Sequence, residues 1–275
     1  MPELAKKRVL ITGGAMGIGY CTAQQFARAG CELILTDVNG EALNHAAAEM
    51  RETGASVCTY TYDVSEQTRV EEVAVSVRDQ IGDIDILINN AGIGHTGELV
   101  ETSMSTWKKL MDVNFWGPLY HVYAYLPRMI ERRSGHIVNV SSGQAYYRLP
   151  TWGAYACIKA ALGIFSEILH FEVRKYNIKV TTVYPFMVNT PFYADLTGDT
   201  FGARLAMKLM PWYSMRPEKV GRIIFDAVNR GRKVEKVSFL NDIGFYAQFV
   251  PLASDLIAMG ANLVLSKRVD AGGAS

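Results

Sequence analysis

Short apolar runs alternate along the chain with longer stretches of helical character. The apolar runs predict strands at Arg8 to Thr12, Leu33 to Thr36, Val57 to Tyr62, Ile84 to Asn89, His136 to Val140 and Ile178 to Tyr184. These runs show little polar alternation, which is typical of a sheet covered by helices on both faces. The stretches between them, such as Ile18 to Ala29 and Gly40 to Thr53, read as helices. This alternation predicts a single α/β domain over residues 1–275, with a doubly wound parallel sheet.

Two segments depart from this rhythm. Residues 190–215 are rich in Met and aromatic side chains, which suit a cover over a bulky apolar substrate because they repack around varied shapes. Packing of these side chains on the protein itself is the alternative. Residues 237–275 form a C-terminal extension that is apolar as far as Leu265, but Asp242, Pro251 and Asp255 make it a poor transmembrane candidate. Core packing, a substrate lid, a subunit interface and peripheral membrane contact all stay open for it.

Charge and cysteine content argue against several classes of protein. With 28 Lys and Arg against 27 Asp and Glu, the net charge is +1, so nothing favours nucleic acid as a partner. The four cysteines, Cys21, Cys31, Cys58 and Cys157, show neither pairing nor metal-ligand spacing, and the five histidines are scattered. We therefore expect a reduced protein with buried thiols and no metal site. The N-terminus runs through basic residues into a strand without a secretory signal, which favours a cytoplasmic protein.

A glycine motif follows the first predicted strand. Gly13, Gly17 and Gly19 stand at the spacing Gly-x-x-x-Gly-x-Gly and open a predicted helix. In the Rossmann fold such glycines form a tight turn and let a pyrophosphate approach the helix N-terminus. Asp37 follows the second strand, where a carboxylate accepts hydrogen bonds from the ribose of NAD and repels the additional phosphate of NADP. Because no Lys or Arg stands at residues 15, 16, 38 or 39, the sequence favours NAD over NADP.

A Tyr-x-x-x-Lys pair lies in the second half of the chain. Of the 14 tyrosines, Tyr155 alone is followed four residues later by a lysine, Lys159. Hydride transfer to a carbonyl leaves an alkoxide that needs a proton, and the reverse reaction needs a base. Lys159 lies one helical turn from Tyr155 on the same face, so its positive charge favours the phenolate. The pair therefore predicts proton transfer at a carbonyl or alcohol oxygen.

Together these motifs resemble those of the short-chain dehydrogenase/reductase family. The resemblance runs from about Val9 to Pro191, and more loosely from Arg216 to Gly231. Asp63-Val64 is similar to the pair that holds the adenine, and Asn89-Asn90-Ala91-Gly92 to the segment after the fourth strand. The resemblance implies a nicotinamide-dependent oxidoreductase whose cofactor contacts come from Gly13, Met16, Gly17, Ile18, Gly19, Asp37, Asp63, Val64, Asn90, Ala91, Gly92, Tyr155, Lys159, Pro185, Val188 and Thr190.

The same resemblance implies four catalytic residues. Tyr155 would be the acid/base, and Lys159 would also hold the nicotinamide ribose. Ser142 would hydrogen-bond the substrate oxygen, and Asn114 would support a water relay to the lysine. Ser141 is the alternative to Ser142, although its side chain points the opposite way if the strand continues. In this family, helices equivalent to those predicted at about residues 107–132 and 155–176 pair subunits, which implies a homodimer or homotetramer.

One departure from the family pattern concerns the segment after the sixth strand. Pro185 is followed by Phe186, where the family usually has glycine, and the added bulk puts the local backbone geometry in question. Further polar candidates near the substrate mouth are His95, Gln144, Tyr147 and Arg148. The apolar character of residues 190–215 leads us to expect a hydrophobic secondary alcohol or ketone as the substrate.

Two other functions fit parts of the sequence. A non-catalytic cofactor-binding scaffold is expected to lose Tyr155, Lys159 or Ser142, and this chain retains all three. A membrane-associated lipid, retinoid or steroid reductase of the same chemistry would use the extension from Val237 as an anchor. A serine hydrolase is disfavoured because Ser142 does not lie in a Gly-x-Ser-x-Gly elbow.

Overall fold

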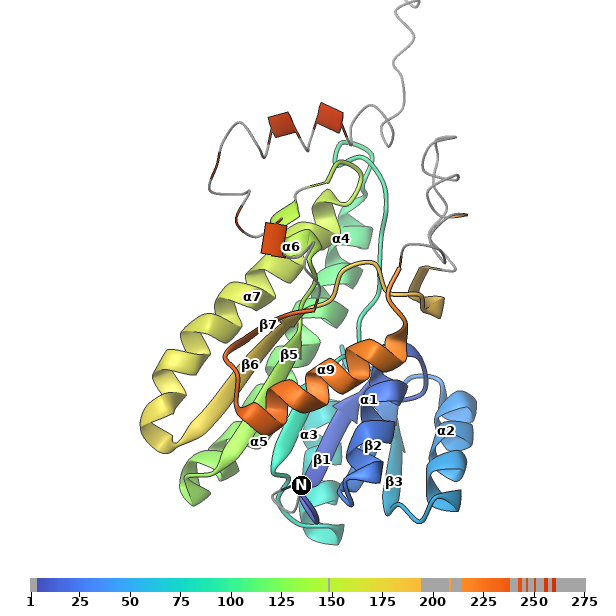
Figure 1. Ribbon diagram of the computed structural model, residues 1–275, viewed down its shortest axis with the longest axis vertical. Helices are drawn as coiled ribbons and strands as arrows, with labels where there is room; N and C mark the ends of the chain where they lie inside the picture. Colours follow the sequence, from blue (N-terminus) through green and yellow to red (C-terminus); the bar gives the residue numbers. More distant parts are fainter. Residues whose placement is uncertain are drawn as a thin grey trace, which may run out of the picture.

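The described part of the computed structural model contains one sheet of seven parallel strands in the order β3-β2-β1-β4-β5-β6-β7 (Figure 1). Described are residues 4–147, 149–193 and 214–237, together with residues 208, 242, 243, 246, 250, 255, 256, 259 and 260. The strands are β1 (Arg8–Thr12), β2 (Glu32–Asp37), β3 (Val57–Thr61), β4 (Ile86–Asn89), β5 (Gly135–Val140), β6 (Ile178–Tyr184) and β7 (Val234–Lys236). The predicted doubly wound parallel sheet is confirmed.

The apolar runs of the sequence correspond to β1 through β6, and the bounds of β1 and β6 are those predicted. Strand β7 was missed by the prediction because it has three residues, of which Glu235 and Lys236 are charged. It pairs with β6 alone, at the edge of the sheet. An edge strand needs no apolar run on both faces, and its charged side chains discourage pairing with another sheet.

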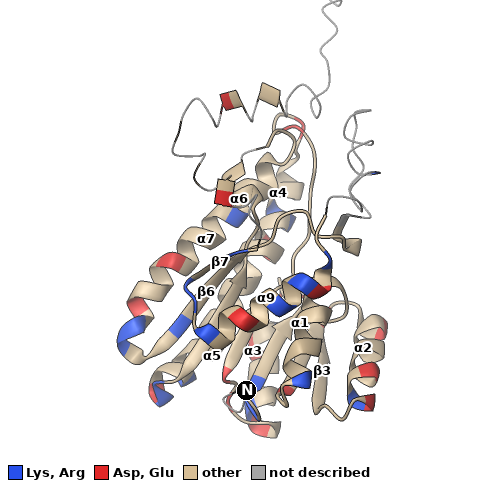
Figure 2. Ribbon diagram, in the orientation of Figure 1, with Lys and Arg blue, Asp and Glu red and all other residues tan. Residues whose placement is uncertain are grey.

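Helices cover both faces of the sheet. On one face lie α1 (Gly17–Arg28), α2 (Gly40–Glu52) and α9 (Pro217–Arg230), over a core that includes Ile11. On the other lie α3 (Gln67–Gln80), α5 (Gly117–Arg132) and α7 (Gly153–Val173), over a core that includes Leu10. Consecutive residues of a strand point to opposite faces, so Leu10 and Ile11 enter different cores and the middle of β1 must be apolar on both faces. Charged side chains of both signs are interspersed along the described helices (Figure 2).

The helix predicted over residues 107–132 is interrupted. Helix α4 (Met104–Met111) passes into a π-helical turn, η1 (Asp112–Trp116), before α5 begins. A π turn is rare and is frequently found at functional sites, and this one carries Asn114. The helix predicted over residues 155–176 begins at Gly153 and ends in a 3₁₀ turn, η2 (Arg174–Tyr176). Two short elements, α6 (Gln144–Tyr147) and η3 (Pro191–Tyr193), follow β5 and β6.

Some sequence predictions concern residues outside the described ranges. The predicted substrate cover at 190–215 and the C-terminal extension at 237–275 lie mostly there, and so does Arg148, so these stay predictions. In the portion of the chain that the structure describes, no helix combines the length and apolar character needed to cross a bilayer. Cys21 and Cys31 are buried, but Cys157 is exposed. The expectation of buried thiols is therefore wrong for Cys157, which lies on the outer side of α7.

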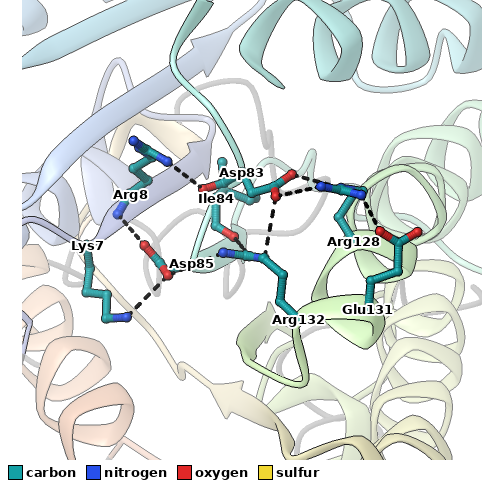
Figure 3. Close-up of polar contacts among 8 residues, drawn as sticks. All are labelled: Lys7, Arg8, Asp83, Ile84, Asp85, Arg128, Glu131 and Arg132. Atoms are coloured by element: carbon teal, nitrogen blue, oxygen red, sulfur yellow. Dashed lines mark hydrogen bonds and ion pairs between the residues drawn. The ribbon is translucent and has the colours of Figure 1, made fainter. Parts of the chain in front are cut away.

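A cluster of ion pairs ties α5 to the N-terminal ends of β1 and β4 (Figure 3). Arg128 on α5 donates to both carboxylate oxygens of Asp83, each at 3.2 Å. The guanidinium of Arg132 lies 3.6 Å from the carboxylate of Asp83 and 3.7 Å from that of Asp85. Asp85 in turn accepts a hydrogen bond from the backbone N–H of Arg8 at 3.0 Å. This cluster stabilises the N-terminal ends of the strands, which lie opposite their carboxyl ends.

The replacement Asp83→Asn is expected to lower the free energy of unfolding by about 1 kcal/mol at pH 7, the upper range for a partly exposed ion pair. Hydrogen bonds from Arg128 lower the pKa of Asp83 below its usual value. Because the folded-state pKa is depressed, the stabilisation is complete above pH 4 and is lost as the pH falls through the folded pKa. Urea unfolding between pH 7 and pH 3 measures this.

A matched control is Glu72→Gln, which removes an exposed pair with Arg69 and is expected to change stability little. A loss at Asp83 that stays constant down to pH 3 would contradict the assignment to its ionised form. Both effects should shrink in 0.5 M salt, because screening weakens exposed ion pairs.

Candidate active site

The predicted site residues gather at the carboxyl ends of the strands. The connections β1–α1–β2 and β2–α2–β3 build the sheet outward from β1 in one direction, and β4 joins β1 on its other side. This change of direction leaves a crevice outside the ends of β1 and β4, where ligands bind in open α/β sheets. The glycine motif follows β1, the Asn90 segment follows β4, and Ser142 follows β5. The sheet thus brings together residues that are more than a hundred positions apart.

The glycine turn after β1 has a backbone that side chains would obstruct. Gly13 and Gly17 have φ values of +65° and +57°, which strain any residue with a Cβ. A Cβ on Gly19 would overlap the carbonyl oxygen of Gly13 and lie 2.6 Å from Nδ2 of Asn90. Helix α1 begins at Gly17. The residue before it, Met16, makes no side-chain hydrogen bond to the first N–H groups of the helix, and the first turn contains no acidic side chain. The uncapped N–H groups and the glycine cradle fit the pyrophosphate of a dinucleotide.

Thr12 and Asn90 hold this turn against the end of β4. Oγ1 of Thr12 accepts hydrogen bonds from the backbone N–H groups of Asn90 and Ala91, each at 3.0 Å. Nδ2 of Asn90 donates to the carbonyl oxygens of Thr12 at 3.0 Å and Gly13 at 3.1 Å. The side-chain amide of Asn90, which the resemblance assigned to the cofactor, therefore supports the turn in this structure. Thr12 is a site-building residue that the predicted set omitted, although it directly precedes the glycine motif.

Two carboxylates lie where the predicted adenosine half of the cofactor would bind. Oδ2 of Asp37 accepts the backbone N–H of Ala15 at 3.1 Å, and Oδ1 accepts that of Asn39 at 3.0 Å. These bonds hold the carboxylate at the end of β2 beside the glycine turn and leave lone pairs for ribose hydroxyls. Oδ1 of Asp63 accepts hydrogen bonds from the backbone N–H and the hydroxyl of Ser65, at 2.9 and 2.7 Å. Val64 is buried next to Asp63.

Tyr155 and Lys159 lie in the first turns of α7, and both are buried. Nζ of Lys159 is 5.8 Å from the centre of the Tyr155 ring and donates to the carbonyl oxygen of Val140 at 3.0 Å. Burial lowers the pKa of Lys159 to about 8. The Tyr155 ring packs between Trp152 and Phe192, at centroid distances of 5.7 and 5.8 Å. Trp152 was not among the predicted site residues, although it lies only three residues before Tyr155 in the chain.

The two serines after β5 differ in their hydrogen bonds. The hydroxyl of Ser141 donates to the carbonyl oxygen of Lys159 at 2.7 Å, so it is occupied in anchoring α7 to β5. Oγ of Ser142 accepts the backbone N–H of Gln144 at 3.2 Å, which leaves its own proton available to a ligand. This difference favours Ser142 over Ser141 as the group that meets a substrate oxygen.

Asn114 and Gly92 lie beside Lys159. Nδ2 of Asn114 donates to the carbonyl oxygens of Ile93 and Leu110, at 3.0 and 3.1 Å, and its Oδ1 accepts the N–H of Ile93 at 3.2 Å. A Cβ on Gly92 would lie 2.7 Å from Oδ1 of Asn114 and 3.4 Å from Nζ of Lys159. The close approach of the three residues therefore requires glycine at position 92, and the π turn directs the side chain of Asn114 toward the end of β4.

Comparison with known proteins identifies the family. The family model for short chain dehydrogenases matches residues 7–200. The chain belongs to the short-chain dehydrogenase family. It is 37% identical over 66% of its length to dehydrogenase/reductase SDR family member 7B of Bos taurus. It is 32% identical over 84% of its length to 1-deoxy-11-beta-hydroxypentalenate dehydrogenase of Streptomyces exfoliatus, of which it covers 82%.

Coverage and fold complete the comparison. The chain spans 58% of the length of the bovine relative and 40% of the length of a mycobacterial one. A short-chain dehydrogenase from Burkholderia phymatum, solved in complex with NAD, has the same fold, with a TM-score of 0.81, 24% identity and full coverage of both chains. The chain thus combines the sequence signature of the short-chain dehydrogenase family with the fold of this solved neighbour.

In this short-chain dehydrogenase, Phe186 packs away from the glycine cradle. Its ring stacks on Tyr147 at a centroid distance of 4.4 Å and covers Gly143, where a Cβ would lie 2.8 Å from Cδ2 of Phe186. The next residue, Met187, adopts φ +49°, a strained value for a residue with a side chain. The added bulk is therefore accommodated beside Tyr147, and the backbone strain falls on Met187.

The residues that follow Met187 approach the glycine turn. Val188 is buried and forms an isolated parallel bridge with Met215. The carbonyl oxygen of Pro185 accepts the N–H of Gly143 at 2.7 Å. A Cβ on Gly17 would lie 3.3 Å from Cγ2 of Thr190. Thr190 thus lies against the glycine turn, and Pro185 is tied to the segment that follows β5.

Of the other polar candidates, His95 contacts a residue of its own loop. Its Nε2 is 3.5 Å from Oγ1 of Thr102, within the loop after β4. Within the described ranges, no three His, Cys, Asp or Glu side chains gather as metal ligands would. Gln144 is buried beside Ser142.

Proposed function

We propose that the protein interconverts a hydrophobic secondary alcohol and its ketone, with NAD(H) as the cofactor and Tyr155 as the acid/base. The observation that carries the proposal is the arrangement of Tyr155 and Lys159 on one face of α7, with Lys159 hydrogen-bonded to the carbonyl oxygen of Val140. Ser142 lies two residues beyond Val140. The contact of Lys159 with Val140 at the end of β5, close to Ser142 in the chain, supports a shared role for the three residues.

In the proposed mechanism the bound nicotinamide supplies or accepts a hydride. The hydroxyl of Ser142 donates a hydrogen bond to the substrate oxygen and stabilises the charge that develops there. In reduction the hydroxyl of Tyr155 gives its proton to that oxygen, and in oxidation the phenolate removes it. The ammonium of Lys159 stabilises the phenolate by its charge. Because burial lowers the pKa of Lys159 to about 8, most of it is charged at pH 7.

The preference for NAD rests on Asp37. Its carboxylate is held by two backbone N–H groups at the end of β2, in the position that meets the adenosine ribose of a Rossmann-bound dinucleotide. A 2′-phosphate would meet this negative charge with no Lys or Arg at residues 15, 16, 38 or 39 to receive it. The Burkholderia phymatum neighbour, solved with NAD, is consistent with this choice.

The replacement Asp37→Ser is expected to raise the KM for NADH by about 10- to 100-fold, the value of one or two hydrogen bonds to a charged group. The KM for NADPH should fall, because the repulsion of its phosphate is removed. Initial rates at varied cofactor concentrations measure the ratio of the two. The exposed Asp79→Ser serves as the control, and an unchanged NADH-to-NADPH preference in Asp37→Ser would remove Asp37 from this role.

The apolar character of the substrate is inferred from the aromatic side chains around Tyr155. The rings of Trp152 and Phe192 both pack against the ring of Tyr155. Phe186, which follows β6, stacks on Tyr147, which follows β5. Binding sites for small ligands are lined mainly by such side chains, with few polar groups. The relative from Streptomyces exfoliatus is named as a dehydrogenase of 1-deoxy-11-beta-hydroxypentalenate, a name that includes a hydroxyl group, and this supports an alcohol as the substrate.

Two partner proposals accompany this function. We propose a homodimer or homotetramer formed through α5 and α7, whose outer faces expose Tyr123, Ile164, Ile168 and Phe171. Peripheral membrane contact of the C-terminal extension is the second proposal, since the described positions Ile243, Tyr246, Val250, Leu256 and Met259 are apolar and exposed. In that case the same chemistry would act on a lipid-like, retinoid or steroid substrate.

The test of the proposed function is the absorbance of reduced cofactor with NADH and NADPH in parallel, across a panel of ketones and, in reverse, their alcohols. Oxidation of NADH by an apolar ketone is the expected result. Use of NADPH alone would keep the reaction and overturn the cofactor proposal. Cofactor binding without turnover of any panel member would favour the scaffold alternative.

A further inference from the structure

Gln144 is a buried polar residue beside the proposed catalytic serine. It is the first residue of α6, it is 4% exposed, and its backbone N–H donates to Oγ of Ser142 at 3.2 Å. The same short helix carries Tyr146 and Tyr147, whose rings lie 5.7 Å apart, and Tyr147 stacks on Phe186. Gln144 is therefore a buried residue of a short helix that otherwise contributes aromatic rings to this part of the structure.

The carboxamide of Gln144 has no hydrogen bond to any other described residue. Its Oε1 is fully buried and without a partner. Buried carboxamides are nearly always hydrogen-bonded, because an unpaired buried polar group loses its water without compensation. A carboxamide carries an acceptor oxygen and a donor NH2 group, so Gln144 offers both kinds of hydrogen bond to a ligand. A folded protein carries such a group at a cost in stability, which a bound ligand removes.

We propose that Gln144 is a specificity-determining residue that hydrogen-bonds a second oxygen of the substrate, close to the reacting carbon. The proposal rests on the proposed function. The backbone of Gln144 is bonded to Oγ of Ser142, so its side chain starts from the same turn that would receive the reacting oxygen. A glutamine side chain reaches only a few bonds from that turn. The geometry therefore points to α-hydroxy ketones, 1,2-diones and vicinal diols within an otherwise apolar frame.

The test compares two ring ketones that differ by one hydroxyl, 2-hydroxycyclohexanone and cyclohexanone, in the unmodified protein and in Gln144→Met. Methionine keeps the length of the side chain but makes no comparable hydrogen bond. For 2-hydroxycyclohexanone, kcat/KM is expected to fall about 10- to 100-fold, mainly through KM, because the site loses its partner for the hydroxyl. For cyclohexanone, kcat/KM should change less than about 3-fold. An equal loss for both ketones, or no loss for either, would overturn the proposal.

Thermal unfolding of the same variants gives a readout that does not require turnover. Without substrate, Gln144→Met should unfold at a higher temperature, by about 2–4 °C, because an unpaired carboxamide is removed from a buried position. The control is Gln24→Met, since Nε2 of Gln24 donates to the hydroxyl of Tyr20 at 2.8 Å, and no rise is expected there. A lower unfolding temperature for Gln144→Met would mean that its amide is satisfied within the protein, and the inference would be wrong.

The two readouts separate this inference from the proposed function. If the unmodified protein reduces neither ketone with either cofactor, the proposed function fails for this class of substrate. The unfolding temperature then still decides on Gln144: a rise supports an amide held in readiness for a ligand, and a fall overturns it. Turnover of both ketones with equal sensitivity to the replacement would keep the proposed function and remove Gln144 from its role.

Discussion

The replacement Tyr155→Phe is expected to lower kcat by about 10²-fold or more, while binding of the cofactor is retained. The change removes one oxygen atom and keeps the ring, which packs between Trp152 and Phe192 at 5.7 and 5.8 Å. The fold and the cofactor cradle should therefore be unaffected, and the loss would report proton transfer alone. Steady-state rates, with cofactor affinity measured by quenching of tryptophan fluorescence, give both quantities.

Tyr20→Phe is the matched control for this variant. The hydroxyl of Tyr20 donates to the exposed carboxylate of Glu49 at 2.6 Å, on the outer side of α1. Its removal should leave kcat unchanged. Normal turnover by Tyr155→Phe would exclude Tyr155 as the acid/base, whereas loss of cofactor binding together with turnover would show that the ring had shifted.

Replacing Lys159 by methionine is expected to have opposite effects on activity and stability. Turnover should fall by about 10²-fold or more, since the positive charge that favours the phenolate of Tyr155 is lost. The free energy of unfolding at pH 7 should rise by about 2 kcal/mol, because a buried charge is removed at the cost of one hydrogen bond to the carbonyl oxygen of Val140. A gain in stability together with a loss of activity is expected where a residue serves catalysis but destabilises the folded protein.

The pH dependence follows from the direction of the pKa shift. Burial lowers the pKa of Lys159 to about 8 in the folded protein, below the usual value of a lysine. Between about pH 8 and pH 10.5 the unfolded chain binds the additional proton, so the stability of the unmodified protein rises with pH over this window. The advantage of Lys159→Met should therefore be full at pH 7 and absent by about pH 10.5.

Urea unfolding at pH 7 and pH 10 checks this, with the exposed Lys219→Met as a control that should change little at either pH. A loss of stability in Lys159→Met at pH 7 would show that the buried ammonium is fully compensated by its surroundings. Activity close to that of the unmodified protein would remove Lys159 from the proposed mechanism.

Much of the fold could be predicted from local pattern. The predicted bounds of β1 and β6 match the strands residue for residue, because a strand covered on both faces is rich in apolar residues with little polar alternation. Strand β7 lies at the edge and carries two charged residues of three, so its pattern is indistinguishable from a loop. The π turn at Asn114 was equally invisible, since its sequence has ordinary helical character and only packing decides where an additional residue enters a turn.

The sequence predicted which residue types form the candidate site better than it predicted their hydrogen-bond partners. The sequence shows the glycine spacing, the Tyr155–Lys159 pair and Asp37. Each of these features is defined by residues close together in the chain or by a residue type that few others can replace. Which polar atoms remain available was not visible. Thr12 and Asn90 turn out to bind each other, and the carboxamide of Gln144 remains without a partner among the described residues.

The sequence by itself determined the succession of β1 to β6 and their helices along the chain, the glycine turn and the residue types that face the crevice. These features follow from patterns of a few neighbouring positions. The tertiary structure alone decided which hydroxyl, amide and ammonium groups meet. The partners come from distant parts of the chain, as in Ser141 with Lys159, 18 residues away, and Thr12 with Ala91, 79 residues away. A hydrogen bond forms within about 3 Å, and only the packing of helices on the sheet sets distances to that accuracy.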